Sequence, residues 1–316
     1  MDTLSDLARG NGKPILVVGG LGFIGSRVMH HLQEQNVPVE FFDTLESAGD
    51  ESVVFRRAIA QGIDITKNQT ECFNNLKDYT AVIMTKGPAR PEFWADKTQD
   101  QISSHINRSF AWTRTTQIPV IYMGSCSIYD GVTKLPASEN ELHVYQASLS
   151  LRSRGKMYAY MKLIEDYELN PTGARSRRAY TATLRLNAVY GPDDSHERLV
   201  PSLLRHAARG TQPEKLTHHP VHLTHLDDVA EAITSIVMTP RYQQNLCVNY
   251  CNERATTPKM LWKYISALYA GKEAELEYTK PAVSIDRLKT GNWGVPMPNR
   301  SIEQGIKGLI EGCDYV

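Results

Sequence analysis

The residues with the clearest capacity for chemistry are Tyr158 and Lys162, which stand four positions apart in the stretch Tyr-Ala-Tyr-Met-Lys. The surrounding segment is expected to be helical, and residues four apart on a helix share one face. Tyrosine has an ordinary pKa of about 10, and a nearby ammonium favours its ionised form, so the phenol can exchange protons with a substrate hydroxyl more readily. The spacing alone also arises by chance on surface helices, so its meaning depends on the surrounding segments.

A serine hydroxyl is expected beside this pair. Ser125 follows the apolar run at 120–123 and precedes Tyr158 by 33 positions. We expect it at the point where a strand leaves the sheet, with Cys126 and Ser127 next to it as further substrate contacts. Cys126 can act as an acid or base only if the pKa of its thiol, ordinarily about 8.5, is shifted; a packed, inert thiol is the favoured interpretation.

A glycine-rich turn follows the first apolar strand, which is predicted at 15–18. Such a turn lets the backbone approach a pyrophosphate closely, and the helix that follows presents free N–H groups and the positive end of its dipole. The residues predicted to contact a dinucleotide here are Gly19, Gly22, Phe23, Ile24 and Gly25.

The identity of the cofactor is predicted from Asp43, which ends the second apolar run, 24 residues after Gly19. A carboxylate at this position accepts hydrogen bonds from the adenosine ribose and repels a 2′-phosphate. No arginine follows it closely. We therefore expect NAD rather than NADP; a glycine-rich turn with a surface aspartate is the alternative.

The elements that must position these residues are short apolar strands alternating with amphipathic helices. This alternation is typical of an α/β fold with a parallel sheet and crossover helices, and strands without polar alternation indicate that both sheet faces are covered. The predicted strands lie at 15–18, 37–42, 81–84, 120–123 and 181–186.

The second half of the chain predicts a smaller α/β lobe. Its expected elements are helices at 200–208, 227–238 and 258–269 and a strand at 246–250. We place the cofactor-binding domain at 1–186 and the substrate-binding lobe at 187–316, with 222–238 returning to the first domain.

Composition and charge exclude several classes of protein. The chain has 316 residues, is 41% hydrophobic, and carries 35 basic and 35 acidic residues, so its net charge is zero. This composition indicates a packed globular protein, and the lack of net basic charge disfavours nucleic-acid binding. No apolar run reaches the roughly 18 residues of a membrane span, and the N-terminal residues lack a signal-peptide pattern. A cytoplasmic protein without a membrane partner is expected.

Neither the cysteines nor the histidines predict a metal site. Five scattered cysteines do not suggest a disulfide framework, and Cys247 and Cys251 lack the second pair that zinc sites use. Histidines occur at 218, 219, 222 and 225, but His222 and His225 on a strand would point to opposite faces. We expect no metal.

Taken in order along the chain, these features resemble the extended short-chain dehydrogenase/reductase family, in particular its NAD-dependent sugar epimerases and dehydratases. The matching stretches are residues 19–25, 43, 64–65, 125–129, 158–162, 184–192, 225–230 and 293–296. The resemblance implies a Rossmann-type, doubly wound parallel sheet and a smaller C-terminal α/β substrate lobe. It also implies a homodimer formed through helices that include the one carrying Tyr158.

The resemblance assigns roles to single residues. It implies that Tyr158 is the general acid or base, that Ser125 orients the substrate, and that Lys162 holds the cofactor and lowers the pKa of the tyrosine. Asp64 and Ile65 would contact the adenine. Asn187 would line the substrate site, or else satisfy backbone groups at a strand end.

Three departures from the family bear on the reaction. Cys126 and Ser127 replace the Asp-Glu pair that handles water elimination in the 4,6-dehydratases, so that chemistry is disfavoured. The arginine expected shortly before His225 is missing, which removes a strong phosphate anchor. The loop after the strand at 81–84 contains Arg90, a candidate for binding a substrate anion, although a solvated arginine is the commoner case. Residues able to replace the missing arginine are Arg198, Lys280, Arg287 and the histidines.

Three hypotheses follow. The preferred one is an NAD-dependent sugar-nucleotide epimerase that oxidises a sugar hydroxyl transiently and keeps its cofactor. The second is a dehydrogenase, reductase or dehydratase of a related, non-nucleotide sugar or polyol. The third is a non-catalytic NAD-sensing regulator, which the presence of both Tyr158 and Lys162 disfavours.

Overall fold

The computed structural model describes residues 2–43, 75–85, 94–114, 116–129, 135–139, 154–169, 180–240 and 245–312. Within these residues, six parallel strands form one sheet in the order β2-β1-β3-β4-β5-β8. The strands are β1 (Ile15–Val18), β2 (Val39–Phe42), β3 (Ala81–Met84), β4 (Val120–Ser125), β5 (Thr181–Leu186) and β8 (Leu246–Tyr250). The Rossmann-type sheet predicted from the sequence is confirmed.

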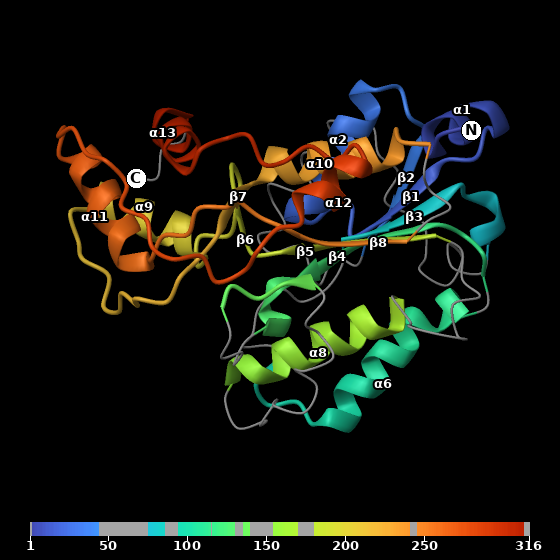
Figure 1. Ribbon diagram of the computed structural model, residues 1–316, viewed down its shortest axis with the longest axis horizontal. Helices are drawn as coiled ribbons and strands as arrows, with labels where there is room; N and C mark the ends of the chain where they lie inside the picture. Colours follow the sequence, from blue (N-terminus) through green and yellow to red (C-terminus); the bar gives the residue numbers. More distant parts are fainter. Residues whose placement is uncertain are drawn as a thin grey trace.

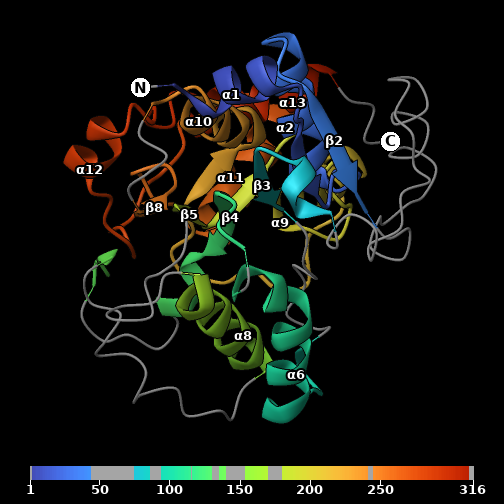
Figure 2. The same ribbon diagram turned by 90° about the vertical axis from the view of Figure 1, so that its right-hand side faces the viewer.

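Helices cover both faces of the sheet, as Figures 1 and 2 show. One face carries α2 (Phe23–Glu34) and α10 (Leu226–Val237), which pack against each other. The opposite face carries α6 (Gln99–Phe110) and α8 (Arg154–Leu169). Since both faces are covered, every residue of β1 and β3 is buried, which explains the unbroken apolar runs of these strands.

The order of the strands fixes where a ligand is expected. The chain proceeds from β1 outward to β2 on one side and from β3 through β4 to β5 on the other. Ligands of open parallel sheets bind at the carboxyl ends of the strands where this order reverses. Here that point lies between β1 and β3, directly at the glycine turn.

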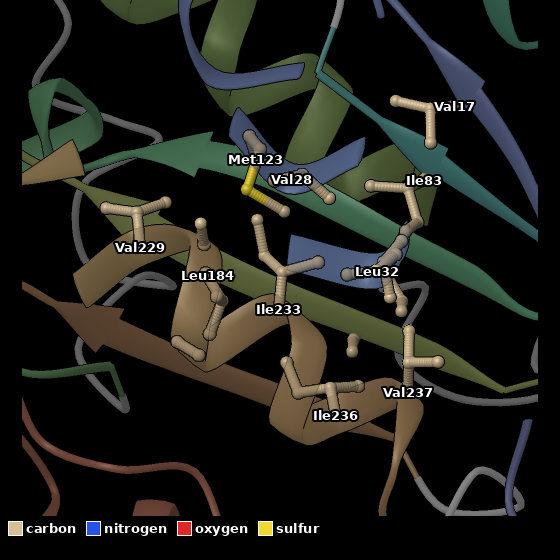
Figure 3. Close-up of a cluster of buried hydrophobic side chains, with 14 of the residues drawn as sticks. Val17, Val28, Leu32, Ile83, Met123, Leu184, Val229, Ile233, Ile236 and Val237 are labelled. Atoms are coloured by element: carbon tan, nitrogen blue, oxygen red, sulfur yellow. The ribbon is translucent and has the colours of Figure 1, made fainter. Parts of the chain in front are cut away.

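The core under α2 and α10 is built from aliphatic side chains (Figure 3). Ile233 of α10 is fully buried and belongs to the same cluster as Val28 of α2 and Leu184 of β5. A separate cluster under α6 and α8 contains Tyr122 and Met161, with Tyr158 packed at its edge. Helix α8 is therefore fixed to the sheet by apolar packing as well as by the polar contacts of the site.

The C-terminal lobe contains a two-stranded parallel sheet and several helices, gathered at one end of the molecule in Figure 1. Its core joins side chains from the helices and from both strands. Its elements are β6 (Ala188–Tyr190), β7 (Leu223–His225), α9 (Leu199–Ala208), α11 (Pro258–Tyr269) and α13 (Ile302–Gly312). Two further helices are α1 (Leu4–Asn11), near the N-terminus, and α12 (Arg287–Asn292).

One element differs from the prediction. The strand at 246–250 was placed in the smaller lobe, but β8 pairs with β5 along its whole length as the edge strand of the main sheet. Parallel pairing joins strands that are far apart in sequence, so no local pattern indicates the partner. The chain thus crosses between sheet and lobe more than once, and the boundary at 186/187 remains a prediction.

No described helix combines the length and the apolar character needed to cross a lipid bilayer.

The core packing gives a first prediction. Ile233→Ala removes a fully buried side chain between α10 and the sheet, and we expect a loss of about 2–5 kcal/mol in the free energy of unfolding. Leu288→Ala, at a side chain that is 80% exposed, is the matched control and should change stability by less than about 0.5 kcal/mol. Urea denaturation of both variants measures the difference; equal losses would contradict the assignment of the core.

Candidate active site

The glycine turn between β1 and α2 requires residues without side chains. Gly19 has a φ of 90°, in the region that favours glycine. A Cβ built at Gly25 would lie 2.1 Å from the carbonyl oxygen of Gly19, so the turn and the helix touch there. The N–H of Gly22 donates to the same carbonyl at 3.0 Å. The turn is thereby closed tightly at the carboxyl end of β1.

The start of α2 is suited to an anion. Its N-cap residue, Gly22, has no side chain and makes no capping hydrogen bond, so no side chain occupies the space before the first helical turn. Backbone N–H groups and the positive end of the helix dipole favour a phosphate at such a position. This geometry fits the pyrophosphate of a dinucleotide.

Asp43 follows β2 beside the glycine turn. Its Oδ2 accepts a hydrogen bond from the N–H of Leu21 at 2.8 Å, which fixes the carboxylate next to the turn. A carboxylate here suits a ribose diol and opposes a 2′-phosphate. The residues present therefore fit NAD, with Gly19, Gly22, Phe23, Ile24, Gly25 and Asp43 as the groups that would hold it.

Thr85, at the end of β3, closes the turn from the other side. Its hydroxyl lies 3.0 Å from the carbonyl oxygen of Val18 and 3.1 Å from that of Gly19, and donates to them. A Cβ at Gly25 would also approach the Thr85 hydroxyl, at 2.7 Å. The contact of Thr85 with the glycine turn was not predicted from the sequence. A hydroxyl residue directly after the apolar run 81–84 is the feature that could have indicated it.

Ser125 ends β4 and is held by its neighbour. Its Oγ lies 2.7 Å from the Oγ of Ser127, and it accepts a hydrogen bond from the N–H of Ser127 at 3.2 Å. Both side chains are partly exposed. The serine hydroxyl is therefore positioned at the carboxyl end of the sheet, where the sequence analysis expected it.

Lys162 is buried and fully engaged, with 7% of its surface exposed. Its ammonium donates to Glu165 Oε2 at 2.9 Å, to the hydroxyl of Tyr122 at 3.2 Å and to the carbonyl of Met123 at 3.5 Å. Burial alone would lower the pKa of Lys162, but the negative charge of Glu165 and its hydrogen bond to the ammonium act in the opposite direction, and the pKa is raised. Lys162 is therefore a cation held against β4, two residues before Ser125.

Tyr122 completes this group. Its hydroxyl donates to Glu165, and burial, followed by the charge of Glu165, raises its pKa well above the ordinary value. It is thus a neutral donor. Tyr158, one helical turn before Lys162, is partly buried and packs against the apolar cluster under α8 that includes Tyr122. The structure consequently brings Lys162 to the strand that ends in Ser125, and the approach of the Tyr158 hydroxyl to Ser125 stays a prediction.

A second buried ion pair joins α8 to β5. Arg185 donates to both carboxylate oxygens of Asp166, at 3.1 and 2.8 Å, and to the hydroxyl of Tyr129 at 2.8 Å. The Tyr129 hydroxyl in turn donates to Asn249 Oδ1 at 2.8 Å. These residues and Glu165 were not assigned from the sequence. Two features of the sequence could have indicated them: a charged residue, Arg185, within the apolar strand 181–186, and two acidic residues, Glu165 and Asp166, after Lys162 on the helix.

Cys126 is a packed thiol. It is 4% exposed and donates to the carbonyl of Arg185, with a sulfur–oxygen distance of 3.1 Å. A hydrogen bond with Cys251, together with burial, raises the pKa of the Cys126 thiol well above its ordinary value. The thiol is therefore protonated at neutral pH and not suited to acid–base chemistry.

The side chains of Asn187 and His222 both form hydrogen bonds with backbone groups. Asn187 Oδ1 accepts from the N–H of Ala188 at 2.9 Å and of His222 at 3.4 Å, which is the strand-end role weighed in the sequence analysis. The His222 ring lies 2.8 Å from the carbonyl of Asn252 and, through Nε2, accepts from the N–H of Ala282 at 3.0 Å. A substrate contact by Asn187 remains a prediction.

His225, another histidine of this segment, caps a helix. His225 Nδ1 accepts from the N–H of Asp227 at 3.2 Å at the start of α10. Within the part of the chain that the structure describes, no three His, Cys, Asp or Glu side chains are arranged to hold a metal ion.

Arg287, another predicted substrate contact, forms an ion pair with a neighbouring loop residue. Arg287 opens α12 with its side chain 69% exposed and pairs with Glu253 through both carboxylate oxygens. A role in substrate binding would require release from Glu253. Arg90, Asp64 and Ile65 lie outside the described residues.

The sheet and the closed glycine turn at its carboxyl edge are those of a Rossmann-type fold. Residues 15–248 match the model of the NAD dependent epimerase/dehydratase family. The chain belongs to this family of NAD-dependent enzymes.

A curated relative and two solved structures are similar to the chain. The ADP-L-glycero-D-manno-heptose-6-epimerase of Alkalilimnicola ehrlichii is 27% identical over 202 residues, 62% of this chain and 59% of the relative's length. The matched region therefore spans less than two thirds of that relative.

Both solved structures share the fold. TunA, an NAD-dependent NDP-hexosamine 5,6-dehydratase involved in tunicamycin biosynthesis, has a TM-score of 0.71 at 20% identity, covering 96% of this chain and 99% of its own. The UDP-glucose 4-epimerase of Thermus thermophilus, in complex with NAD, has a TM-score of 0.70 at 18% identity, covering 94% of this chain and 98% of its own.

The closeness of the turn to α2 gives a second prediction. Gly25→Ala places a Cβ 2.1 Å from the Gly19 oxygen, so the turn must shift away from the cofactor position. We expect at least a tenfold weaker affinity for NAD by calorimetry, or about 1.4 kcal/mol. Gly308→Ala, where a Cβ meets nothing within 4 Å, should leave the affinity unchanged. Unchanged NAD affinity in Gly25→Ala would count against this binding site.

His222 gives a third prediction, on pH and stability. Burial lowers the pKa of His222 below its ordinary 6.5, so the folded protein holds the ring neutral while the unfolded chain protonates it first. Protonation then favours unfolding, and stability should fall as the pH drops below about 6.5. His222→Gln should flatten this dependence and His218→Gln, at an exposed site, should not. Thermal unfolding between about pH 5 and pH 7.5 measures it; identical slopes in all three proteins would contradict the assignment.

Proposed function

We propose that the protein is an NAD-dependent sugar-nucleotide epimerase, which oxidises one sugar hydroxyl transiently and restores it with inverted configuration. The observation that supports this proposal is the contact of Lys162, one helical turn after Tyr158, with the strand that ends in Ser125. The glycine turn, bonded to Asp43, lies at the same edge of the sheet. A hydroxyl, a phenol and a buried ammonium in this arrangement supply proton transfer at one carbon.

Each of these residues has a distinct task in the proposal. Tyr158 takes the proton from the substrate hydroxyl and later returns it. Ser125, fixed by Ser127, hydrogen-bonds the same oxygen and orients it. Lys162 supplies a permanent positive charge next to Tyr158. Positioned proton transfer of this kind contributes roughly 10²–10⁴-fold in rate. NAD, held by the glycine turn and Asp43, supplies hydride acceptance when bound.

Water elimination of the 4,6-dehydratase type is disfavoured by the contacts around Ser125. Cys126, which stands where those enzymes carry an acid, is buried and its thiol is bonded to the Arg185 carbonyl. The two carboxylates of α8 near Tyr158, Glu165 and Asp166, are each bound by a cation. These contacts favour epimerisation over dehydration.

Arg198 is our candidate for binding the diphosphate of the substrate. It precedes α9, and its guanidinium carbon lies 6.0 Å from the ring centre of Phe23, the first residue of α2. Its ion pair with Asp194 is long, at 3.5 Å, and burial raises the pKa of Asp194 to about 6. This cation can therefore replace the arginine that is missing before His225.

The proposal includes a cytoplasmic homodimer formed through α6 and α8. Tyr167 lies on α8 and is 45% exposed, which leaves an aromatic surface on this helix. Light scattering on the purified protein would show a dimer, and a Tyr167→Glu variant would shift it toward the monomer.

An isotope experiment tests the proposed reaction. The protein is incubated in D₂O with ADP-heptose, UDP-glucose and UDP-N-acetylglucosamine in turn, and the products are followed by NMR. Epimerisation by hydride return keeps the carbon-bound hydrogen of the substrate. Deuterium at the inverted carbon, or loss of water from the sugar, would contradict the proposal.

Tyr158→Phe gives a fourth prediction. Loss of the phenolic oxygen should lower the turnover of the accepted nucleotide sugar by roughly 10²–10⁴-fold. Affinity for NAD should change little, since the ring and its packing remain. Tyr167→Phe removes an exposed hydroxyl from the same helix and should keep full activity. Retained turnover in Tyr158→Phe would remove this residue from the mechanism.

A further inference from the structure

The ammonium of Lys162 has no unused hydrogen in this structure. Its three donors are directed to Glu165, Tyr122 and the Met123 carbonyl, at 2.9, 3.2 and 3.5 Å. Glu165 is itself only 3% exposed, and it binds Lys162 and Tyr122 with the same oxygen. The carboxylate of Glu165 therefore fixes the ammonium of Lys162, and the hydroxyl of Tyr122 on β4 hydrogen-bonds to both groups.

The charges around Tyr158 cancel in pairs. Asp166 is bound through both oxygens by Arg185, which leaves Glu165 as the anion that offsets Lys162. An isolated ammonium near a phenol favours the phenolate, whereas an ammonium paired with a carboxylate acts more weakly because the two fields oppose each other. Removing the charge of Glu165 would leave one uncompensated positive charge beside Tyr158.

The described ionisable groups on the elements packed against α8 do not offset the charge of Lys162. Helix α6 contributes the exposed Asp100 and His105, which contacts Trp94. Strand β4 contributes Tyr122, and the 3₁₀ helix η4 (Cys126–Tyr129) contributes Cys126 and Tyr129, all neutral. Strand β5 contributes Arg185, already paired with Asp166. Among these described groups, Glu165 is the carboxylate bound to Lys162.

We propose that Glu165 is a positioning residue, which fixes the Lys162 ammonium and offsets its charge, so that Tyr158 loses its proton at a higher pH than a lone lysine would set. The inference rests on the proposed function, in which Tyr158 exchanges the proton. In that setting, the phenolate of Tyr158 is a stronger base toward the sugar hydroxyl, at the expense of activity at low pH, where less phenolate is present. Tyr122 supports the pair by hydrogen bonding to both partners.

The titration of Tyr158 can be measured without a sugar substrate. Protein labelled with ¹³C at the tyrosine Cζ atoms and saturated with NAD is titrated by NMR, and the Tyr158 signal is identified by its absence in Tyr158→Phe. We expect Glu165→Gln to lower the pH midpoint of Tyr158 by about one unit. Glu168→Gln, which removes a carboxylate from the same helix outside the hydrogen bonds of Lys162, should leave the midpoint in place.

A double variant keeps the test decisive if Glu165→Gln does not fold. Lys162→Met/Glu165→Met replaces the buried ion pair by apolar side chains, a change that such sites often tolerate. Because both opposing charges leave together, the midpoint should move by less than about half a unit. A rise of a full unit would mean that Lys162 acts as an uncompensated cation, and would overturn the inference.

The outcomes separate the inference from the proposed function. An unchanged midpoint in Glu165→Gln, with Tyr158→Phe inactive, would refute the role of Glu165 and leave the function standing. An equal shift in Glu168→Gln would also refute it, since the effect would not depend on contact with Lys162. Activity in Tyr158→Phe would refute the proposed function itself, whatever the titration shows.

Discussion

Two buried ion pairs of α8, one within the helix and one to the sheet, are the constraint on which the candidate site depends. Lys162–Glu165 lies against β4, and Asp166–Arg185 connects the next position of the helix to β5. Buried ion pairs add little net stability, but removing one partner costs about 3–5 kcal/mol, so Asp166–Arg185 strongly disfavours displacement of the helix. Lys162 and Glu165 add to this effect through their hydrogen bonds to Tyr122 and Met123 of β4. The helix that carries Tyr158 is thereby held in one register against the strand that ends in Ser125.

The cofactor side of the site depends on steric limits more than on charge. Gly25 touches Gly19 across the turn, Thr85 bonds the same segment, and Asp43 holds it from β2. These contacts come from three neighbouring strands, β1, β2 and β3, and meet where the strand order reverses. The turn and the α8 group therefore lie at the carboxyl edge of one sheet.

The features predicted best from the sequence were those with local signals. Apolar runs marked the strands, and the helices at 200–208, 227–238 and 258–269 agree with α9, α10 and α11 within one residue at each end. The pairing of β8 with β5 and of Arg185 with Asp166 could not be predicted, because both depend on contacts between distant segments. For Asn187, the sequence allowed either a substrate contact or hydrogen bonds to the backbone at a strand end. The structure shows the backbone hydrogen bond.

In the proposed mechanism, this enzyme holds NAD as a resident cofactor and regenerates it within each turnover. Mass spectrometry of the small molecules released on denaturing the purified protein tests this most directly. The account predicts NAD in nearly stoichiometric amount and no NADP, since Asp43 opposes a 2′-phosphate. A protein that releases no dinucleotide and binds added NAD weakly would contradict the account, and NADP in place of NAD would contradict the role of Asp43.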